Sequence, residues 1–322
     1  MSGSRARTLT RRGRGEGTAA APLVHDAPTT SSRWRVAGVR EIRMPPARAF
    51  VLTLLAMVAF AANSLLCRQA LRSTGMDPAT FTAIRLLAGA VMLGVLIGVR
   101  RRRPGGTWLS AAALFAYAAA FSIAYVRLSA ATGALLLFGA VQVTMHAYGA
   151  WSGERLSGAQ AIGVLVAAAG LLGLLLPGLT APPLGSACAM LGAGIAWGVY
   201  SLRGKGSGDP TADTAGNFLR SVPMALLLVL VAAKPMGLES RGVACAIASG
   251  AIASGLGYAV WYAVLPSLRA TTAASVQLSV PVIAALGGVV LLGEPIGLRL
   301  VLASIAVLGG VALALRPARE RT

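Results

Sequence analysis

Long apolar segments alternate with short polar connections from residue 49 to residue 315. A helix that crosses a bilayer needs about 20 mostly apolar residues. Residues that helices avoid internally, such as Pro78, Pro210 and Pro295, mark several of the connections. The pattern predicts an all-α, polytopic membrane protein with ten transmembrane helices, at residues 49–67, 80–99, 107–126, 131–151, 157–176, 184–203, 214–233, 242–264, 271–292 and 297–315.

The composition agrees with a membrane protein and argues against a nucleic-acid-binding one. Hydrophobic residues make up 56% of the 322 residues and charged residues only 12%, which is too apolar for a soluble domain of this length. The net charge of +19 is compatible with phosphate binding. However, ten of the 29 Lys and Arg precede residue 49 and four more form the run Arg100 to Arg103. The remaining basic residues mostly flank apolar segments, as the positive-inside rule describes.

The basic residues also predict the orientation. With a cytoplasmic N-terminus, 21 Lys and Arg fall on the cytoplasmic side, six fall on the outer side and two lie within helices. This bias predicts a multi-pass protein of the cytoplasmic (inner) membrane, with both termini in the cytoplasm.

Residues 1–46 form a basic segment that is rich in Gly, Ser, Thr and Pro and has no apolar periodicity. We expect a disordered cytoplasmic tail. Met44 stands just before the first apolar segment, so we also expect native translation to start there. Peptides from residues 15–40 in the native host would contradict that start. The sequence Ala59-Phe60-Ala61 resembles a signal-peptidase site. Cleavage there conflicts with the internal repeat, which needs this segment as its first helix.

The repeat has a period of about 132 to 140 residues. Each repeat holds five predicted helices, an odd number, so the second repeat is inverted in the membrane relative to the first. The predicted boundaries are 47–177 and 182–316. Five landmarks recur in the same order: Phe60-x-x-Asn63-Ser64-Leu65 with Trp197-x-x-Tyr200-Ser201-Leu202, Asp77-Pro78 before Arg85 with Asp209-Pro210 before Arg220, Tyr125 with Tyr262, Ala131-Thr132 with Thr271-Thr272, and Gly153-Glu154 with Gly293-Glu294.

With these landmarks, residues 48–315 resemble the drug/metabolite transporter superfamily, and specifically its EamA-type ten-helix transporters. The resemblance rests on the five-plus-five pattern, Arg85 and Arg220, Pro281 in the ninth helix and the two Gly-Glu pairs. It implies export or exchange of small metabolites, amino acids or drugs by alternating access, with a substrate site near the membrane midplane between the repeats. Val141 replaces the proline in the first repeat, so we expect a sharp bend only in the ninth helix.

Polar and aromatic side chains within the apolar segments are the candidates for a substrate cavity. We select seven of them as cavity-lining residues: Asn63, Gln142, His146, Trp197, Tyr200, Tyr258 and Gln277. Arg85 and Arg220 have two interpretations. They attract a substrate carboxylate, or they have a scaffold role in which each snorkels to its membrane interface or bonds helix-end carbonyls; their duplication favours the scaffold. Glu154 and Glu294 are each expected to stabilise the start of their own helix, because carboxylates favour helix N-termini. For Glu154 the alternative is a gating ion pair with a cytoplasmic arginine.

No catalytic or metal site is predicted. The chain has no His-Glu-x-x-His motif and no phosphate loop, and Cys67, Cys188 and Cys245 have no ligand spacing. We therefore expect a non-enzyme without cofactors, whose partners are a small-molecule substrate and the lipid bilayer. A homodimer is left open. The alternative function is a non-transporting membrane receptor or assembly protein.

Overall fold

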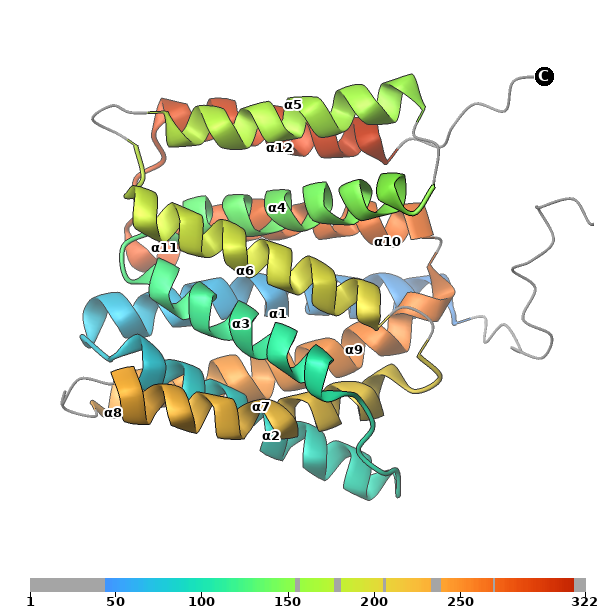
Figure 1. Cartoon of the computed structure of the whole chain (residues 1–322), viewed down its shortest axis with the longest axis vertical. Coiled ribbons are helices and arrows are strands. Elements are labelled where there is room, and N and C mark those ends of the chain that lie inside the picture. Colours follow the sequence, from blue (N-terminus) through green and yellow to red (C-terminus); the bar gives the residue numbers. More distant parts are fainter. Residues whose placement is uncertain are drawn as a thin grey trace, which may run out of the picture. The chain divides into compact units, whose positions relative to one another are not determined.

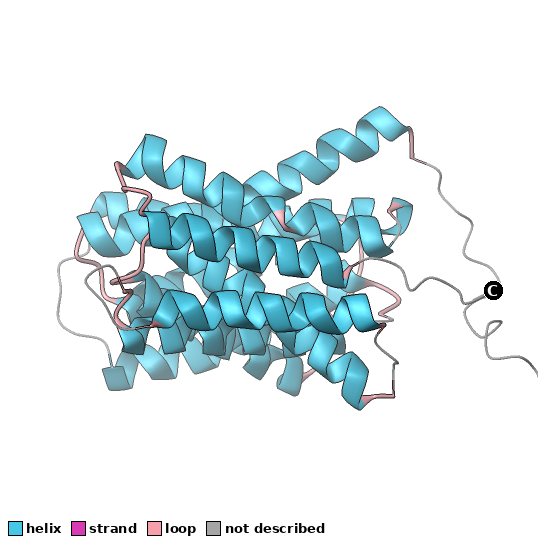
Figure 2. Ribbon diagram, turned by 90° about the horizontal axis from the view of Figure 1, so that it is seen from above, coloured by secondary structure: helices cyan, strands magenta, loops and turns pink. Residues whose placement is uncertain are grey.

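The computed structural model describes residues 44–153, 157–176, 181–204, 207–232, 239–268 and 270–315. These residues form helices that run side by side (Figures 1 and 2), in alternating directions along the chain (Figure 1), with no strand among them. The predicted tail at residues 1–46 lies outside the described residues except for its last three, and so does Glu154.

The helices follow the predicted segments. Eight helical stretches are at least 18 residues long and apolar enough to cross a membrane; α11 and α12 are shorter, with 14 and 17 residues. The bounds are α1 Pro46–Ser73, α2 Pro78–Val99, α3 Trp108–Tyr125, α4 Ala130–Trp151, α5 Gly158–Leu175, α6 Leu184–Arg203, α7 Pro210–Ala232, α8 Ser240–Ile247, η1 Ala248–Leu256, α9 Gly257–Val264, η2 Leu265–Ser267, α10 Ala270–Gln277, α11 Ser279–Leu292 and α12 Leu298–Ala314. The predicted ten-helix fold is confirmed, with α8, η1 and α9 forming the eighth span and α10 with α11 the ninth.

Local sequence explains where several helices begin. Asp77 caps α2 by accepting a hydrogen bond from the backbone N–H of Thr80 at 3.0 Å, and Pro78 occupies the first turn, where no backbone donor is needed. Asp209 and Pro210 repeat this arrangement at α7, where the Asp209 carboxylate accepts from the N–H of Ala212 at 3.1 Å. The Asp-Pro landmarks are therefore helix-start signals.

The ninth span is broken where proline requires it. Pro281 lacks the N–H that would bond the carbonyl four residues earlier, and α10 ends at that residue, Gln277. The equivalent α4 continues without interruption through Val141 for 22 residues. The eighth span has a different irregularity, the nine-residue π-helix η1. Among its residues, a Cβ on Gly250 would lie 2.1 Å from the Arg85 carbonyl oxygen, so glycine permits η1 to approach α2.

The packing of the two halves has the symmetry of an inverted repeat. In two cases a helix packs directly on its own repeat partner: α2 packs on α7, and α5 packs on α12. Each of the other major contacts has a counterpart in which both helices are replaced by their repeat partners. The contact of α3 with α6 corresponds to that of α1 with α8 to α9, the contact of α4 with α6 to that of α1 with α11, and the contact of α3 with α7 to that of α2 with η1. The first four spans of each half therefore enclose the central region, while α5 and α12 form a pair at one side (Figure 1).

Candidate functional site

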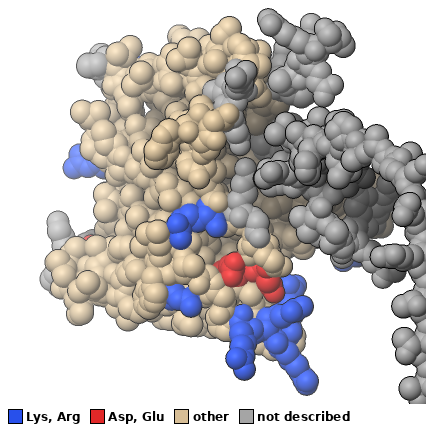
Figure 3. Space-filling view, turned by 45° about the vertical axis from the view of Figure 1, so that its right-hand side comes forward, with Lys and Arg blue, Asp and Glu red and all other residues tan. Residues whose placement is uncertain are grey.

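A cavity of about 420 Å³ lies between the two halves. It extends from the exposed residues Arg203 and Gly204, at the end of α6, to Asn63 and Tyr117 in the interior. We call the first end the mouth; it also carries the exposed run Arg100 to Arg103 and the ion pair between Arg102 and Asp209, 3.9 Å apart. Figure 3 shows basic side chains gathered beside acidic ones on this side of the molecule. The cavity is therefore open at the mouth.

Six of the seven residues selected from the sequence line this cavity: Asn63, Gln142, Trp197, Tyr200, Tyr258 and Gln277. His146 is not among the described lining residues. Its Nδ1 lies 2.8 Å from the carbonyl oxygen of Gln142, so the ring engages the backbone of its own helix. The sequence selection omitted Tyr117, Ser254 and Asn217, which also line the cavity. Ser254 carried no signal, because a serine in an apolar helix commonly bonds its own backbone.

Aromatic rings form one wall. The Trp197 ring stacks on Tyr258, with centroids 5.3 Å apart and an interplanar angle of 24°, and it also contacts Tyr117 and Tyr200 at 4.8 and 5.3 Å. Phe60 extends the cluster through its contact with the Tyr258 ring, with centroids 5.6 Å apart. Such rings present flat apolar faces with a polar edge, which suits the apolar part of a small ligand.

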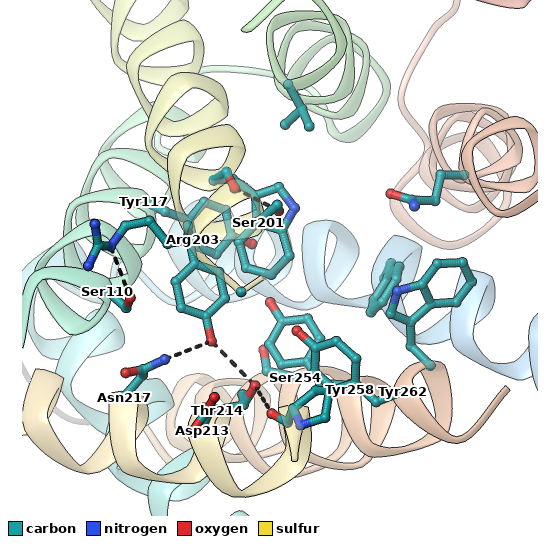
Figure 4. Close-up of a pocket in the computed structure, with 18 of the residues that line it drawn as sticks. Ser110, Tyr117, Ser201, Arg203, Asp213, Thr214, Asn217, Ser254, Tyr258 and Tyr262 are labelled. Atoms are coloured by element: carbon teal, nitrogen blue, oxygen red, sulfur yellow. Dashed lines mark hydrogen bonds between the residues drawn. The ribbon is translucent and has the colours of Figure 1, made fainter. Parts of the chain in front are cut away.

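Near the mouth, polar groups on α3, α6 and α7 hold the aromatic wall in place (Figure 4). The Tyr200 hydroxyl lies 3.4 Å from both the Thr214 hydroxyl and the Asn217 amide nitrogen. The guanidinium of Arg203 donates to the Ser110 hydroxyl at 3.1 Å. The Arg203 bond connects α6 of the second half with α3 of the first, and the Tyr200 bonds connect α6 with α7 within the second half.

The connection between α2 and α3 is bound to α7 beside the mouth. Asp213 accepts a hydrogen bond from the backbone N–H of Gly106 at 2.8 Å, and Asn217 accepts from the N–H of Thr107 at 2.9 Å. Gly106 has φ +77°, and an added Cβ would lie 2.2 Å from the Asn217 side-chain oxygen. Only glycine fits this turn without strain.

Arg85 lies deep in the protein, at the inner end of the cavity. Its side chain is 1% exposed. One terminal nitrogen, Nη2, donates to the Tyr117 hydroxyl at 3.0 Å, and the guanidinium lies over the rings of Tyr117 and Phe121, 5.2 and 4.8 Å from their centroids. The other two nitrogens, Nε and Nη1, are buried without a hydrogen-bond partner among the described residues. The scaffold interpretation proposed that Arg85 bonds a helix-end carbonyl. Among the described residues Arg85 makes no such bond.

Arg220 behaves differently. Its Nη1 donates to the backbone carbonyl of Gly105, in the connection between α2 and α3. The two arginines are also out of register, because Arg85 follows Pro78 by seven residues and Arg220 follows Pro210 by ten. The residue seven positions after Pro210 is Asn217. The positions of the two arginines in their helices therefore differ by about one turn. The duplication that favoured a shared scaffold role is not an exact one.

The end of the bundle opposite the mouth is closed; we call it the sealed end. Arg68 donates through Nε to Glu294 at 2.9 Å and through Nη1 to the carbonyls of Tyr125 and Val126 at 3.0 and 2.9 Å. The second carboxylate oxygen of Glu294 accepts from the N–H of Ala130 at 2.7 Å. Glu294 and Arg68 are only 5% and 11% exposed, so the ion pair joins α1, the start of α4 and the end of α11.

Glu294 does not lie at the start of its own helix, as predicted from the sequence, but at the start of another one. Gly293 ends α11 in the left-handed region, with φ +63°, and the N–H of Glu294 bonds the Gly288 carbonyl at 3.0 Å. Helix α12 begins later, at Leu298. The carboxylate therefore lies at the N-terminus of α4 from the other half, where the helix dipole also favours it.

The comparisons with known proteins agree with this architecture. A model of the EamA-like transporter family matches residues 47–176 and again residues 184–316. Uncharacterized protein PA1977 of Pseudomonas aeruginosa is 60% identical over 277 residues, which cover 85% of this chain and 96% of that protein.

A solved structure titled "Crystal structure of protein" has a TM-score of 0.60 at 20% identity, covering 84% of this chain and 98% of that one, which shows a shared fold. The EamA family is a class of small-molecule transporters rather than enzymes, and its members are multi-pass membrane proteins. With two family matches that together span most of its length, this chain belongs to the EamA-like transporter family.

Proposed function

We propose that the protein is a secondary transporter, an exporter or exchanger, that moves small metabolites, amino acids or drugs across the cytoplasmic membrane by alternating access. The observation that carries the proposal is a cavity between two inverted halves that is open at the mouth and closed by the Arg68–Glu294 ion pair at the sealed end. In an inverted repeat, exchange of the two halves' conformations opens the opposite end around the same central site.

The orientation belongs to the same proposal. The mouth carries Arg100 to Arg103 and Arg203, and the positive-inside rule favours placing this end in the cytoplasm. The structure then corresponds to an inward-open state. Both termini lie on the cytoplasmic side in this arrangement.

The cavity favours a modest-sized amphipathic substrate. Its volume of about 420 Å³ is near the lower end of small-molecule sites, which span roughly 300–1,000 Å³. The aromatic wall around Trp197 offers contact for an apolar body, and the hydroxyl and amide groups of Tyr117, Ser254 and Gln277 offer hydrogen bonds.

Counterflow in proteoliposomes tests transport directly. Purified protein in liposomes loaded with members of a broad metabolite and drug panel is expected to accumulate the labelled form of at least one member, above protein-free liposomes. Trp197→Leu is expected to reduce that flux, because it removes the ring that contacts Tyr117, Tyr200 and Tyr258. Trp108→Leu is the matched control, since Trp108 is 61% exposed and does not line the cavity.

Absence of counterflow across the whole panel, together with stable capture of a protein partner by the intact chain, would favour the receptor or assembly function. Equal flux from the Trp197 and Trp108 variants would show that substrate does not pass the aromatic wall.

A further inference from the structure

The buried guanidinium of Arg85 has no counter-charge among the residues that the structure describes. It is permanently ionised, 1% exposed and located within α2. Burying a charge in an apolar medium is costly unless the charge is paired and hydrogen-bonded. The tyrosine hydroxyl and the faces of two aromatic rings satisfy the guanidinium only in part, because Nε and Nη1 have no partner among the described residues.

The described carboxylates are engaged elsewhere. Asp77 caps its own helix, Asp209 pairs with Arg102, and Asp213 bonds the N–H of Gly106. Glu294 pairs with Arg68 at the sealed end. Glu239 is exposed at the start of α8. The region around Arg85 therefore keeps a net positive charge in the described part of the chain.

The Tyr117 hydroxyl connects the charge of Arg85 to the cavity. The Tyr117 oxygen accepts from Arg85 Nη2 at 3.0 Å and from Asn63 Nδ2 at 3.2 Å. The Asn63 oxygen in turn accepts from the Ser249 hydroxyl at 2.6 Å. A phenol oxygen has two lone pairs and one proton. Both lone pairs are used, so the proton is left to donate, and Tyr117 lines the cavity. A donor polarised by a neighbouring cation suits an anionic acceptor.

Among the residues that the structure describes, the second half has no equivalent buried charge. Asn217, seven residues after Pro210, occupies the register of Arg85, and its amide bonds the Thr107 N–H and the Tyr200 hydroxyl. Arg220 is bound to the Gly105 carbonyl. If the buried charge served only the scaffold, the inverted half would need it too. Its presence in one half at the inner end of the cavity points to a ligand.

We propose that the inner end of the cavity is an anion subsite, where the carboxylate of an organic-acid substrate accepts the Tyr117 hydroxyl proton with Arg85 directly behind it. The apolar body of the substrate lies against Trp197 and Tyr258. The substrate class is thus a monocarboxylate with an aromatic or aliphatic body. This inference rests on the proposed transport function, because it assigns a ligand to the same cavity.

Matched acids and amides test the subsite without knowledge of the native substrate. The probes are 3-phenylpropionate, cyclohexanecarboxylate and hexanoate, each compared with its own primary amide, which has nearly the same shape but no charge. Binding to the purified full chain is measured by calorimetry. At least one acid is expected to bind at least tenfold more tightly than its amide. Equal affinity within every pair, or no binding by any of the three acids, would overturn the proposal.

Variants identify the residues responsible. Arg85→Gln is expected to abolish the preference for the acid, Arg85→Lys to keep part of it, and Tyr117→Phe to weaken it while leaving the ring beneath the guanidinium. Arg220→Gln is the matched control, because it removes a charge from α7, the repeat partner of α2, at a residue that is not among the described cavity-lining residues. If Arg85→Gln does not fold, Tyr117→Phe and Arg85→Lys carry the test. A preference for the acid that is unchanged in Tyr117→Phe, or that Arg220→Gln weakens as much as Arg85→Gln does, would refute the assignment.

Flux measurements separate this inference from the proposed function. Acid binding that depends on Arg85, without counterflow of that acid, would leave the subsite standing and remove the transport function. Counterflow of neutral or cationic solutes that is identical in wild type and Arg85→Gln would leave transport standing and remove the subsite.

Discussion

Replacing Glu294 by Gln is expected to favour opening of the sealed end. The substitution keeps the size of the side chain and an oxygen for the Ala130 N–H, but removes the charge that pairs with Arg68 at 2.9 Å and faces Arg72 at 3.8 Å. Because Glu294 is only 5% exposed, water screens this interaction weakly. Glu239 supplies the control, since it is an exposed carboxylate at the same end of the bundle.

The magnitude follows from the lost contacts. A hydrogen bond to a charged group contributes about 1.5–3 kcal/mol, and a carboxylate at a helix N-terminus adds about 0.3–1 kcal/mol. Glutamine retains neutral versions of the hydrogen bonds, so the closed state loses about 2 kcal/mol of stabilisation. Since about 1.4 kcal/mol corresponds to a factor of ten, the ratio of closed to open populations falls roughly 30-fold.

Distance measurements between spin labels read out this change. Labels at Arg127→Cys and Ile296→Cys occupy exposed positions on the two connections that meet at the sealed end. We expect Glu294→Gln to increase the population with the longer distance, and Glu239→Gln to leave the distribution unchanged. Identical distributions for Glu294→Gln and wild type, with both proteins folded and monodisperse, would refute the gating role of the Arg68–Glu294 pair.

Three further substitutions test the packing around the site. Gly106→Ala is expected to lower the melting temperature, since strain at φ +77° costs about 1–3 kcal/mol and the new Cβ would lie 2.2 Å from Asn217; Gly94→Ala, with open space around it, is expected to cause no loss. Gly250→Ala is expected to destabilise the protein by about 1–3 kcal/mol, because its Cβ would lie 2.1 Å from the Arg85 carbonyl oxygen. Gly309→Ala, with open space around the residue, is expected to have little effect. Equal thermal stability of the two variants would contradict the close approach of η1 to α2. Pro281→Ala restores a backbone donor, so we expect a continuous ninth helix, a higher melting temperature and slower counterflow; unchanged flux would show that the break is not used in transport.

The sequence predicted the parts of this fold that depend on local rules. Apolar length located the spans, and Asp77-Pro78 and Asp209-Pro210 marked two helix starts. Pro281 predicted the break in the ninth span, because the loss of a backbone donor acts locally. The odd number of spans in each repeat predicted the inversion that the packing pairs display.

Contacts between distant segments were beyond sequence reasoning. Glu294 was expected to open its own helix, but it bonds Ala130, 164 residues away, because the connection after α11 folds over the start of α4. The order of the landmarks suggested that Arg85 and Arg220 were equivalent, although Asn217, seven residues after Pro210, has the register of Arg85 and the two arginines have different partners. The π-helix η1 also lacked a signal, since no single residue requires that geometry.

Sided labelling of a cavity residue tests alternating access most directly. In a background without native cysteines, Gln277→Cys places a thiol on the cavity wall. In proteoliposomes of uniform orientation, a membrane-impermeant thiol reagent is predicted to label it from the mouth side in wild type. The same reagent is predicted to label it from the sealed side during substrate turnover and in the Glu294→Gln variant. Labelling from the mouth side alone under all of these conditions would contradict the account.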